Sequence, residues 1–362
     1  MKQLDIILDK AVQHGAITTQ DMVYLLQLTQ PADREQLYRV ARQRRQSIFD
    51  NKVFLYGFVY FSTYCRNDCT FCYYRKSNSH CQRYRKTSRE IVDIASALGQ
   101  SGVHLIDLTM GEDPQYLSNN QVGYQQLIEV VKMVKQATKL PIMISPGVVP
   151  REVLRQLQQA GAEWYACYQE THNRELYSRL RLNQEYEERW GIKVFAKTLG
   201  MLVEEGLLVG VGDNAQDAAH SLLEMNKLGA DQVRTMSFVP QAGTPLYNTT
   251  AVNSIYELNV IAVMRLLFPN RLIPASLDVE GIQGLKQRLE AGANVITSII
   301  PPDAGLAGVS QSTLDISEGY RTVMGVTPIL RECGLEPATQ QEYAQWLNQR
   351  LGYGLKEGIV CE

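Results

Sequence analysis

The sequence has little of what marks the more specialised classes of protein. Its 362 residues are 45% hydrophobic and 20% charged, an ordinary globular composition that excludes long disordered and collagen-like segments. Lysine and arginine (36) nearly balance aspartate and glutamate (38), and the formal net charge of −2 argues against a general polyanion binder. No short-period repeat or low-complexity linker divides the chain.

Long apolar runs are also missing. No run reaches the ~18 residues needed to span a bilayer, because the longest mixed stretches contain Glu204, Glu205 or Arg265. The first fifteen residues carry acidic side chains where a signal peptide would have its apolar core. We therefore expect a cytoplasmic protein that binds neither a membrane nor nucleic acid.

Cysteine is scarce but clustered. Seven cysteines are too few for a disulfide scaffold, and an odd count leaves at least one unpaired. In a reducing cytosol, clustered cysteines more often bind metal or take part in chemistry. Three of the seven, Cys65, Cys69 and Cys72, lie within eight residues, and this cluster is the most informative short signal in the chain.

Most of the chain alternates between apolar, β-branched runs and helical patterns that end in glycine. Eight strands alternating with helices predict a parallel sheet with right-handed crossovers. Eight such units in about 250 residues match a closed (β/α)8 barrel, and a doubly wound open sheet is the alternative. The predicted strands are residues 53–61, 104–110, 141–145, 163–170, 202–212, 231–239, 271–276 and 293–300.

The barrel is expected to occupy residues 51–305. Residues 1–50 read as an N-terminal helical extension, in which Thr18 or Thr19 caps the second helix and Pro31 opens the third. The basic run at 39–47 is interpreted as a solvated helix face, because it lacks the interleaved aromatic residues of RNA binders. Residues 306–362 are expected to form a C-terminal helical segment and tail.

Polar side chains gather where the predicted strands end. In a (β/α)8 barrel the active site lies at the C-terminal ends of the strands, so these residues predict a site rich in charge. A surface loop or helix cap is the alternative for each of them taken alone. They are Asp107, Gly111, Glu112, Asp113, Ser145, Gln169, Glu170, Arg234, Ser237, Ser276 and Asp278.

The cysteine cluster has the spacing C-x3-C-x2-C, with Phe71 directly before the last cysteine. Three thiolates on one loop suit three corners of a cuboidal [4Fe–4S] cluster, whose fourth iron could then chelate the amino and carboxylate groups of S-adenosylmethionine (SAM). One alternative is structural zinc with Cys81 as fourth ligand, although no second C-x2-C pair is present. The other is a redox-inert group of buried cysteines.

The stretch FSTYCRNDCTFCYY resembles the radical SAM enzymes. The segments IDLTMGEDP, PIMISPG, YQET, PQAGTP, RLIPASLD and NVITSIIPPD extend this resemblance to the methylornithine-forming branch of the biotin-synthase-like group, from about residue 35 to 340. The cluster motif alone indicates the superfamily, whereas IDLTMGEDP and RLIPASLD are much narrower. The resemblance implies a radical SAM barrel of the TIM type.

The resemblance also implies a cofactor site. Cys65, Cys69 and Cys72 would ligate the cluster, and the reactive group would come from SAM rather than from a catalytic side chain. For Arg181 and Arg189, the alternative is a surface helix pair beside Glu185, Glu187 and Glu188. The residues assigned to SAM are Phe71 at the adenine, Gly111 and Glu112 near the amino group, and Ser145, Glu170, Arg181 and Arg189.

The implied substrate is L-lysine. Arg234 and Ser276 would hold its α-carboxylate, Asp278 its α-ammonium and Asp107 its distal ammonium. The chemistry agrees independently, since an α-amino acid with a side-chain amine needs one cation and two anions, and unpaired buried charges are costly. A structural core acid is the alternative for Asp107.

The implied reaction is isomerisation of L-lysine to (3R)-3-methyl-D-ornithine in pyrrolysine biosynthesis. An adenosyl radical abstracts hydrogen, the Cα–Cβ bond breaks, and the fragments recombine; we expect SAM to be regenerated. A low-potential donor such as flavodoxin or ferredoxin would supply the electron. The alternatives are a related radical enzyme acting on another amino acid or a tRNA-borne substrate, and a zinc-stabilised scaffold or RNA-binding protein.

The remaining cysteines carry weaker expectations. Cys81 follows the cluster with Arg75, Lys76 and His80 in what is interpreted as a solvated basic loop, and is expected to be an unligated thiol. Cys167 is expected in the core, because free cysteine is commonly buried. No role is assigned to Cys333 or Cys361.

Overall fold

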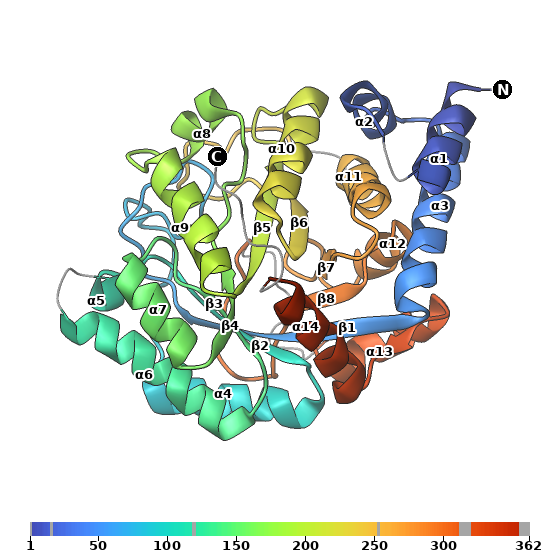
Figure 1. The fold of residues 1–362 in the computed structure, drawn as a ribbon. Helices are drawn as coiled ribbons and strands as arrows, with labels where there is room; N and C mark the ends of the chain where they lie inside the picture. The colour runs from blue at the N-terminus through green and yellow to red at the C-terminus, as the bar shows by residue number, and fades with distance from the viewer. Residues whose placement is uncertain (1, 15–16, 118–120, 252–253, 311–319, 355–362) are drawn as a thin grey trace.

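A ring of eight parallel strands forms the centre of the computed structural model, which describes residues 2–14, 17–117, 121–251, 254–310 and 320–354 (Figure 1). The strands are hydrogen-bonded in the order β6-β5-β4-β3-β2-β1-β8-β7. They are β1 (Lys52–Ser62), β2 (Leu105–Met110), β3 (Ile142–Ser145), β4 (Ala162–Ala166), β5 (Leu202–Val209), β6 (Gln232–Ser237), β7 (Pro274–Ser276) and β8 (Val295–Ile299).

The ring closes between β6 and the residue segment that leads into β7. Leu272 accepts a hydrogen bond from the Val233 N–H at 3.0 Å and donates one to the Asp231 carbonyl at 3.1 Å, in a parallel bridge with Gln232. The predicted barrel is therefore confirmed, and the open-sheet alternative is excluded. β7 is shorter than predicted, because 271–273 serves this closure, and β4 ends at Ala166 rather than at residue 170.

Helices surround the ring as the glycine-terminated patterns predicted. Thr87 caps the first barrel helix in a capping box with Glu90, and Gly102 ends it in the left-handed conformation that glycine adopts at no steric cost. The helices are α4 (Ser88–Ser101), α5 (Pro114–Leu117), α6 (Gln121–Thr138), α7 (Arg151–Gln159), α8 (Arg174–Leu180), α9 (Tyr186–Thr198), α10 (Ala215–Leu228), α11 (Ser254–Leu267) and α12 (Leu285–Glu290).

The N-terminal extension packs beside α11 and α12 as α1 (Gln3–His14), α2 (Thr19–Leu26) and α3 (Pro31–Phe49) (Figure 1). Thr18 caps α2 and Pro31 opens α3, as predicted. The prediction that the basic run of α3 is a solvated face is wrong for Arg45. This side chain is 5% exposed and donates to the carbonyls of Leu289 and Ala293, at 2.5 and 3.1 Å.

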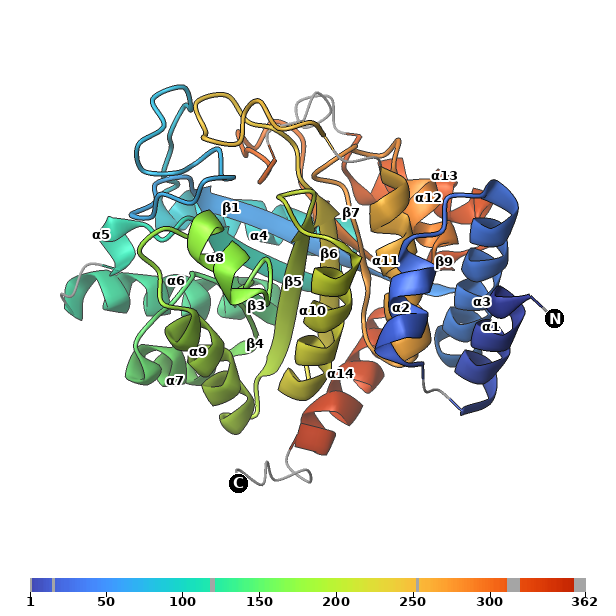
Figure 2. The ribbon, with the colours of Figure 1, turned by 90° about the horizontal axis from the view of Figure 1, so that it is seen from above.

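The C-terminal segment closes the N-terminal end of the barrel. It consists of α13 (Val323–Glu332), β9 (Glu336–Pro337), which pairs with the start of β1, and α14 (Gln340–Gly354). Tyr343 of α14 shares a buried hydroxyl hydrogen bond of 2.9 Å with Tyr56, and Trp346 stacks on Trp164. Figure 2 shows α14 on one side of the barrel and the long loops after β1 and β6 on the opposite side.

Alternating residues of the strands divide the barrel interior into two layers. The lower layer is apolar and includes Leu105, Met143 and Leu202. Two residues further along the same strands, and so on the same face, lie Asp107, Ser145 and Glu204. The barrel is therefore filled by hydrocarbon at its closed end and by polar groups at the end where the loops gather.

In the described ranges, no helix has the length and apolarity to cross a membrane.

Candidate active site

A cavity of about 240 Å³ opens at the C-terminal ends of the strands. All the residues assigned to the cluster, to SAM and to the substrate line it except Ser276. Among the other polar residues at the strand ends, Ser237 lines the cavity, whereas Asp113 and Gln169 do not. Ser276 is 2% exposed, and its hydroxyl accepts a hydrogen bond from the Asp278 N–H at 3.3 Å. The cavity thus brings together side chains from seven strand ends and from the cysteine loop.

The cysteine loop follows β1, and its three cysteines all face the cavity. Burial raises the pKa of Cys65 to about 11, with a further increase from Cys69, and burial together with the other two thiols raises the pKa of Cys72 further. Cys69 is buried and Cys65 and Cys72 are partly buried, and three thiolates that repel one another at such a site need a cation between them. A thiolate-bound metal cluster supplies this charge, so the donor set fits a [4Fe–4S] cluster.

The environment of the cysteines also bears on the zinc alternative. Cys81 does not line the cavity; its thiol lies 3.4 Å from the Asn78 carbonyl and packs near Tyr73. Within the described ranges, no three His, Cys, Asp or Glu side chains are grouped closely enough to hold one metal ion. A cuboidal cluster instead binds each thiolate to a different iron, so its ligands lie further apart than those of a single ion.

Gly111 allows the loop after β2 to approach the cysteine loop. A Cβ atom at this position would lie 2.3 Å from the carbonyl oxygen of Tyr64, so any larger residue would push the loops apart. The neighbouring Asp113 is fully buried. Its carboxylate accepts hydrogen bonds from the Ser62 hydroxyl at 2.5 Å and from Nε and Nη2 of Arg85 at 2.7 and 2.9 Å. These contacts fix the position of the cysteine loop.

Two buried ion pairs lie on the side of the cavity next to the cysteine loop. We group Glu112, Glu170, Arg181 and Arg189, with Arg66 in the neighbouring pocket, as the cofactor half. Arg181 binds Glu170 and Arg189 binds Glu112, each at 2.7 Å. Arg181 and Arg189 are 8% and 4% exposed, which excludes the surface-helix alternative. Burial works to raise the pKa of Glu112, but Arg189 and Arg66 hold it below its usual range.

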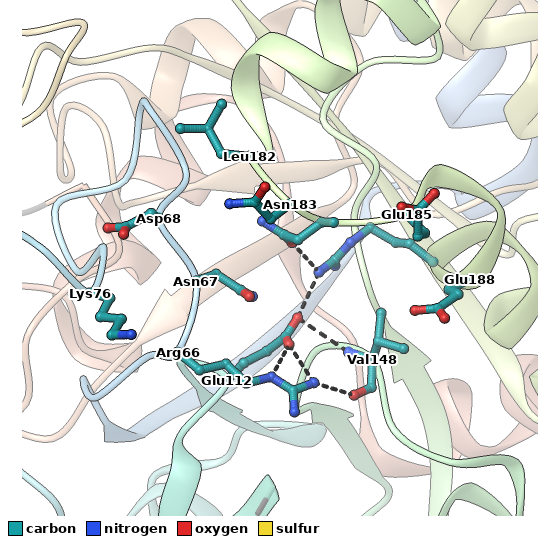
Figure 3. Close-up of a pocket in the computed structure, with 12 residues that line it drawn as sticks. Arg66, Asn67, Asp68, Lys76, Glu112, Val148, Leu182, Asn183, Glu185 and Glu188 are labelled. Atoms are coloured by element: carbon teal, nitrogen blue, oxygen red, sulfur yellow. Dashed lines mark hydrogen bonds and ion pairs between the residues drawn. The ribbon is translucent and has the colours of Figure 1, made fainter.

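Figure 3 shows the outer side of this half, where the Arg66 guanidinium lies beside the Glu112 carboxylate. Arg66 of the cysteine loop approaches its carboxylate to 3.0 Å from one side, and Arg189 of α9 from the other. The pocket in the figure holds about 420 Å³ and shares Asn67, Glu112 and Arg189 with the central cavity. The Glu112 carboxylate therefore stands at the boundary between the two spaces.

The substrate half, defined as the cavity-lining Asp107, Arg234 and Asp278 together with the fully buried Glu204 and Arg321 behind them, contains two further buried ion pairs. Arg234 binds Glu204 at 2.7 Å, and Arg321 binds Asp278 at 2.8 Å. Asp107 differs from the other acids, since it forms no ion pair among the described residues and accepts from the Thr109 and Ser145 hydroxyls at 2.8 and 3.2 Å. Burial, with a smaller contribution from Glu204, raises the pKa of Asp107 to about 7.

Several functional side chains were missed by the sequence analysis. Glu204 lies on the inward face of β5, two residues after Leu202, so strand alternation could have assigned it to the polar layer. Arg321 lies well beyond the last barrel strand, and no local signal marks it. Cys167 is buried as predicted, but it also accepts a hydrogen bond from Arg189 at 2.9 Å. Cys361 lies outside the described residues.

The loop after the cysteines is less solvated than expected. Lys76 and His80 are exposed, as predicted. Arg75 is half-buried, with Nε 3.6 Å from the Asp68 carboxylate and Nη2 donating to the Asp68 carbonyl at 3.2 Å. Arg83 donates to the carbonyls of Thr63 and other loop residues. The arginines therefore serve mainly to shape the loop.

A parallel barrel with three cysteines on the loop after its first strand, facing a charged cavity, is the architecture of a radical SAM enzyme. The family model of the radical SAM superfamily matches residues 59–223. The 3-methylornithine synthase of Methanosarcina acetivorans is 44% identical over 342 residues, which are 94% of this chain and 96% of that protein. The chain belongs to the 3-methylornithine synthase family, as the sequence motifs predicted.

Structural comparison agrees with this assignment. The crystal structure of methylornithine synthase (PylB) aligns with a TM-score of 0.89 and 43% identity, covering 94% of this chain and 99% of that one. A more distant relative, the [FeFe] hydrogenase maturase subunit HydE of Thermotoga maritima, is 30% identical over 80% of this chain and 82% of its own. Membership of the superfamily implies SAM and a [4Fe–4S] cluster as cofactors.

Proposed function

We propose that this protein is a radical SAM mutase that converts L-lysine into (3R)-3-methyl-D-ornithine for pyrrolysine biosynthesis. The observation that carries the proposal is the charge of the substrate half. Its three acids, Asp107, Glu204 and Asp278, are accompanied by two cations, Arg234 and Arg321, which leaves one negative charge when Asp107 is ionised. Lysine carries one net positive charge at neutral pH, so it neutralises this half of the cavity.

The binding roles follow from the position of each group. Arg234 is held by Glu204 and by the Thr297 hydroxyl at 3.1 Å, and its planar guanidinium would bind the α-carboxylate, with Ser276 nearby. Asp278 would bind the α-ammonium. Asp107 would bind the distal ammonium and thereby gain the ion-pair partner that it lacks among the described residues. The alternative in which Asp107 is a structural core acid gives no reason for it to line the cavity.

The cofactor half has the opposite balance, since two acids face three arginines. Cys65, Cys69 and Cys72 would hold the cluster, and Phe71, Gly111, Glu112, Ser145, Glu170, Arg181 and Arg189 would hold SAM. When bound, these cofactors supply the 5′-deoxyadenosyl radical that starts the reaction. The excess arginine charge suits the thiolate ligands, and Arg181 already lies 3.8 Å from the Cys69 sulfur.

The loops over the cavity support a reaction that needs protection from water. Gln241 of the loop after β6 donates to the Ser310 carbonyl at 2.5 Å, and Asn78 of the cysteine loop donates to the Ala242 carbonyl at 2.9 Å. These bonds join loops from three strands above the site (Figure 2). A covered site would keep the two fragments of the broken Cα–Cβ bond together and exclude competing reactions.

The test is an anaerobic assay of the reconstituted enzyme. Reductant, SAM and ¹³C-labelled L-lysine are added, and the amino acids are separated by chiral chromatography with mass detection, since substrate and product have the same mass. We expect a new isomeric peak that is absent with Cys65→Ala. No new peak, with 5′-deoxyadenosine released, would reject lysine in favour of another amino acid. Release of one 5′-deoxyadenosine per product would contradict the regeneration of SAM.

The cellular setting is part of the same proposal. A low-potential flavodoxin or ferredoxin would reduce the cluster, and we place the enzyme in the cytoplasm, where thiols stay reduced. Reduction of the purified holoenzyme by such a protein, monitored by the electron paramagnetic resonance of the cluster, tests the donor.

A further inference from the structure

The carboxylate of Asp278 is held from two sides by residues that the predicted site did not include. The Ser298 hydroxyl of β8 donates to Oδ2 at 2.7 Å. The Arg321 guanidinium, which lies just before α13, donates from Nη2 to Oδ1 at 2.8 Å. Arg321 also donates from Nε to the Ser298 carbonyl at 3.1 Å, so the three residues form one closed cluster.

This cluster contains features that are unfavourable in an ordinary barrel core. Ser298 lies inside a strand with φ of 66°, a conformation that residues other than glycine rarely adopt and that, within a strand, stores strain of the kind that clusters at functional sites. Arg321 is fully buried, and its Nη1 has no hydrogen-bond partner within the described structure. A buried ion pair of this kind gives little stability compared with hydrocarbon of the same size.

The position of the cluster indicates what these features serve. Ser298 and Asp278 line the cavity, whereas Arg321 lies behind them. Arg321 donates to one oxygen of the carboxylate and Ser298 to the other, so the two residues together fix its rotation. A carboxylate accepts up to about four hydrogen bonds, so a ligand ammonium can share it with both residues and with the Val309 N–H, which donates to Oδ1 at 3.4 Å.

We propose that Arg321 and Ser298 are positioning residues that fix the Asp278 carboxylate for the α-ammonium group of the substrate. This inference rests on the proposed function, because it takes an α-amino acid to be the ligand. It predicts that the two residues affect the recognition of the α-amino group alone. Recognition of the substrate carboxylate and of its distal amine should be independent of them.

The test compares two ligands that differ in this group. L-Lysine and 6-aminohexanoate share the carboxylate and the distal amine, but the second compound has no α-amino group. Their dissociation constants are measured by anaerobic calorimetry with the reconstituted, SAM-bound enzyme. We expect Arg321→Met to weaken lysine binding by about tenfold or more, the loss typical of a charge-assisted contact, and to change 6-aminohexanoate binding by less than about threefold.

Three further variants distinguish positioning from a general effect on folding. Arg321→Lys should restore part of the lysine affinity, and Ser298→Ala, which keeps the fold more readily, should show the same ligand selectivity with a smaller loss. Arg45→Met removes another buried arginine far from the cavity. It should lower the melting temperature without changing the affinity ratio of the two ligands.

The outcomes separate the inference from the proposed function. Equal weakening of both ligands by Arg321→Met and Ser298→Ala, or an unchanged lysine affinity in both, would overturn the positioning role. If the wild-type enzyme bound neither compound, the proposed function itself would fail.

Discussion

Substitution of Asp107 by asparagine tests the electrostatic basis of substrate choice. The change preserves the shape of the side chain and its contacts with Thr109 and Ser145, but removes the negative charge that has no partner cation in the described structure. A buried, charge-assisted hydrogen bond contributes about 1.5–3 kcal/mol. We therefore expect the lysine dissociation constant of Asp107→Asn to rise roughly 10- to 150-fold at pH 8.

The pH dependence of binding provides a second signature. The pKa of Asp107 is raised to about 7 by burial in the ligand-free protein, and a bound ammonium would lower it. Below pH 7, lysine must therefore displace a proton, and its affinity should fall by up to about tenfold per pH unit. Asp107→Asn should lose this dependence, because the amide does not titrate in this range.

Asp107→Asn should weaken lysine binding but raise the stability of the ligand-free fold. Because the folded-state pKa of Asp107 lies above its unfolded value of 3.8, the ionised carboxylate destabilises the ligand-free fold, and stability is lost as the pH rises through 7. Asp107→Asn should thus unfold at a higher temperature than the wild type at pH 8 and at nearly the same temperature at pH 4. The difference in unfolding free energy is at most about 4 kcal/mol.

Calorimetry of the reconstituted enzyme with lysine and norleucine, between pH 5.5 and 8.5, measures these effects. Norleucine lacks the distal amine, so its binding should be the same for Asp107→Asn and the wild type. A variant that bound lysine within about threefold of the wild type, with the same pH dependence, would refute the assignment. Asp107 would then be a structural acid.

Three other substitutions test how the fold supports the site. Gly111→Ala should reduce the iron bound after reconstitution, because its Cβ would meet a backbone oxygen of the cysteine loop at 2.3 Å. Full iron content in this variant would show that the loop is free to move. Tyr343→Phe removes a buried hydroxyl hydrogen bond and should lower the unfolding free energy by about 1 kcal/mol in denaturant titration. A change in lysine affinity would contradict a role confined to the closed end of the barrel. Lys193→Met leaves the buried carboxylate of Glu205 without its ion-pair cation and should cost about 3–5 kcal/mol. Added Glu205→Gln should recover part of this loss, because it removes the charge and keeps the oxygen that accepts from the Gln169 and Gly206 N–H groups. A double variant no more stable than the single one would refute this account.

The sequence alone determined the barrel and the composition of its mouth. Strand and helix periods are local properties, and eight alternations with short connections leave few topologies. The parallel topology then places every strand end on one side, so Asp107, Arg234 and Asp278 could be assigned to one site before their contacts were known. The cysteine spacing was equally local, since all three ligands lie on one loop.

The tertiary structure decided which charges neutralise one another. Arg189 could have been a surface residue by its sequence context, yet it binds Glu112 from a different part of the barrel. Arg321 reaches Asp278 from beyond the barrel strands, and Arg45 turns inward from a helix that reads as solvated. Periodicity specifies the face on which a residue lies, but the partner across a packed interface depends on how elements distant in the chain meet. That arrangement leaves Asp107 without an ion-pair partner in the described structure, and this property is the basis of the proposed choice of substrate.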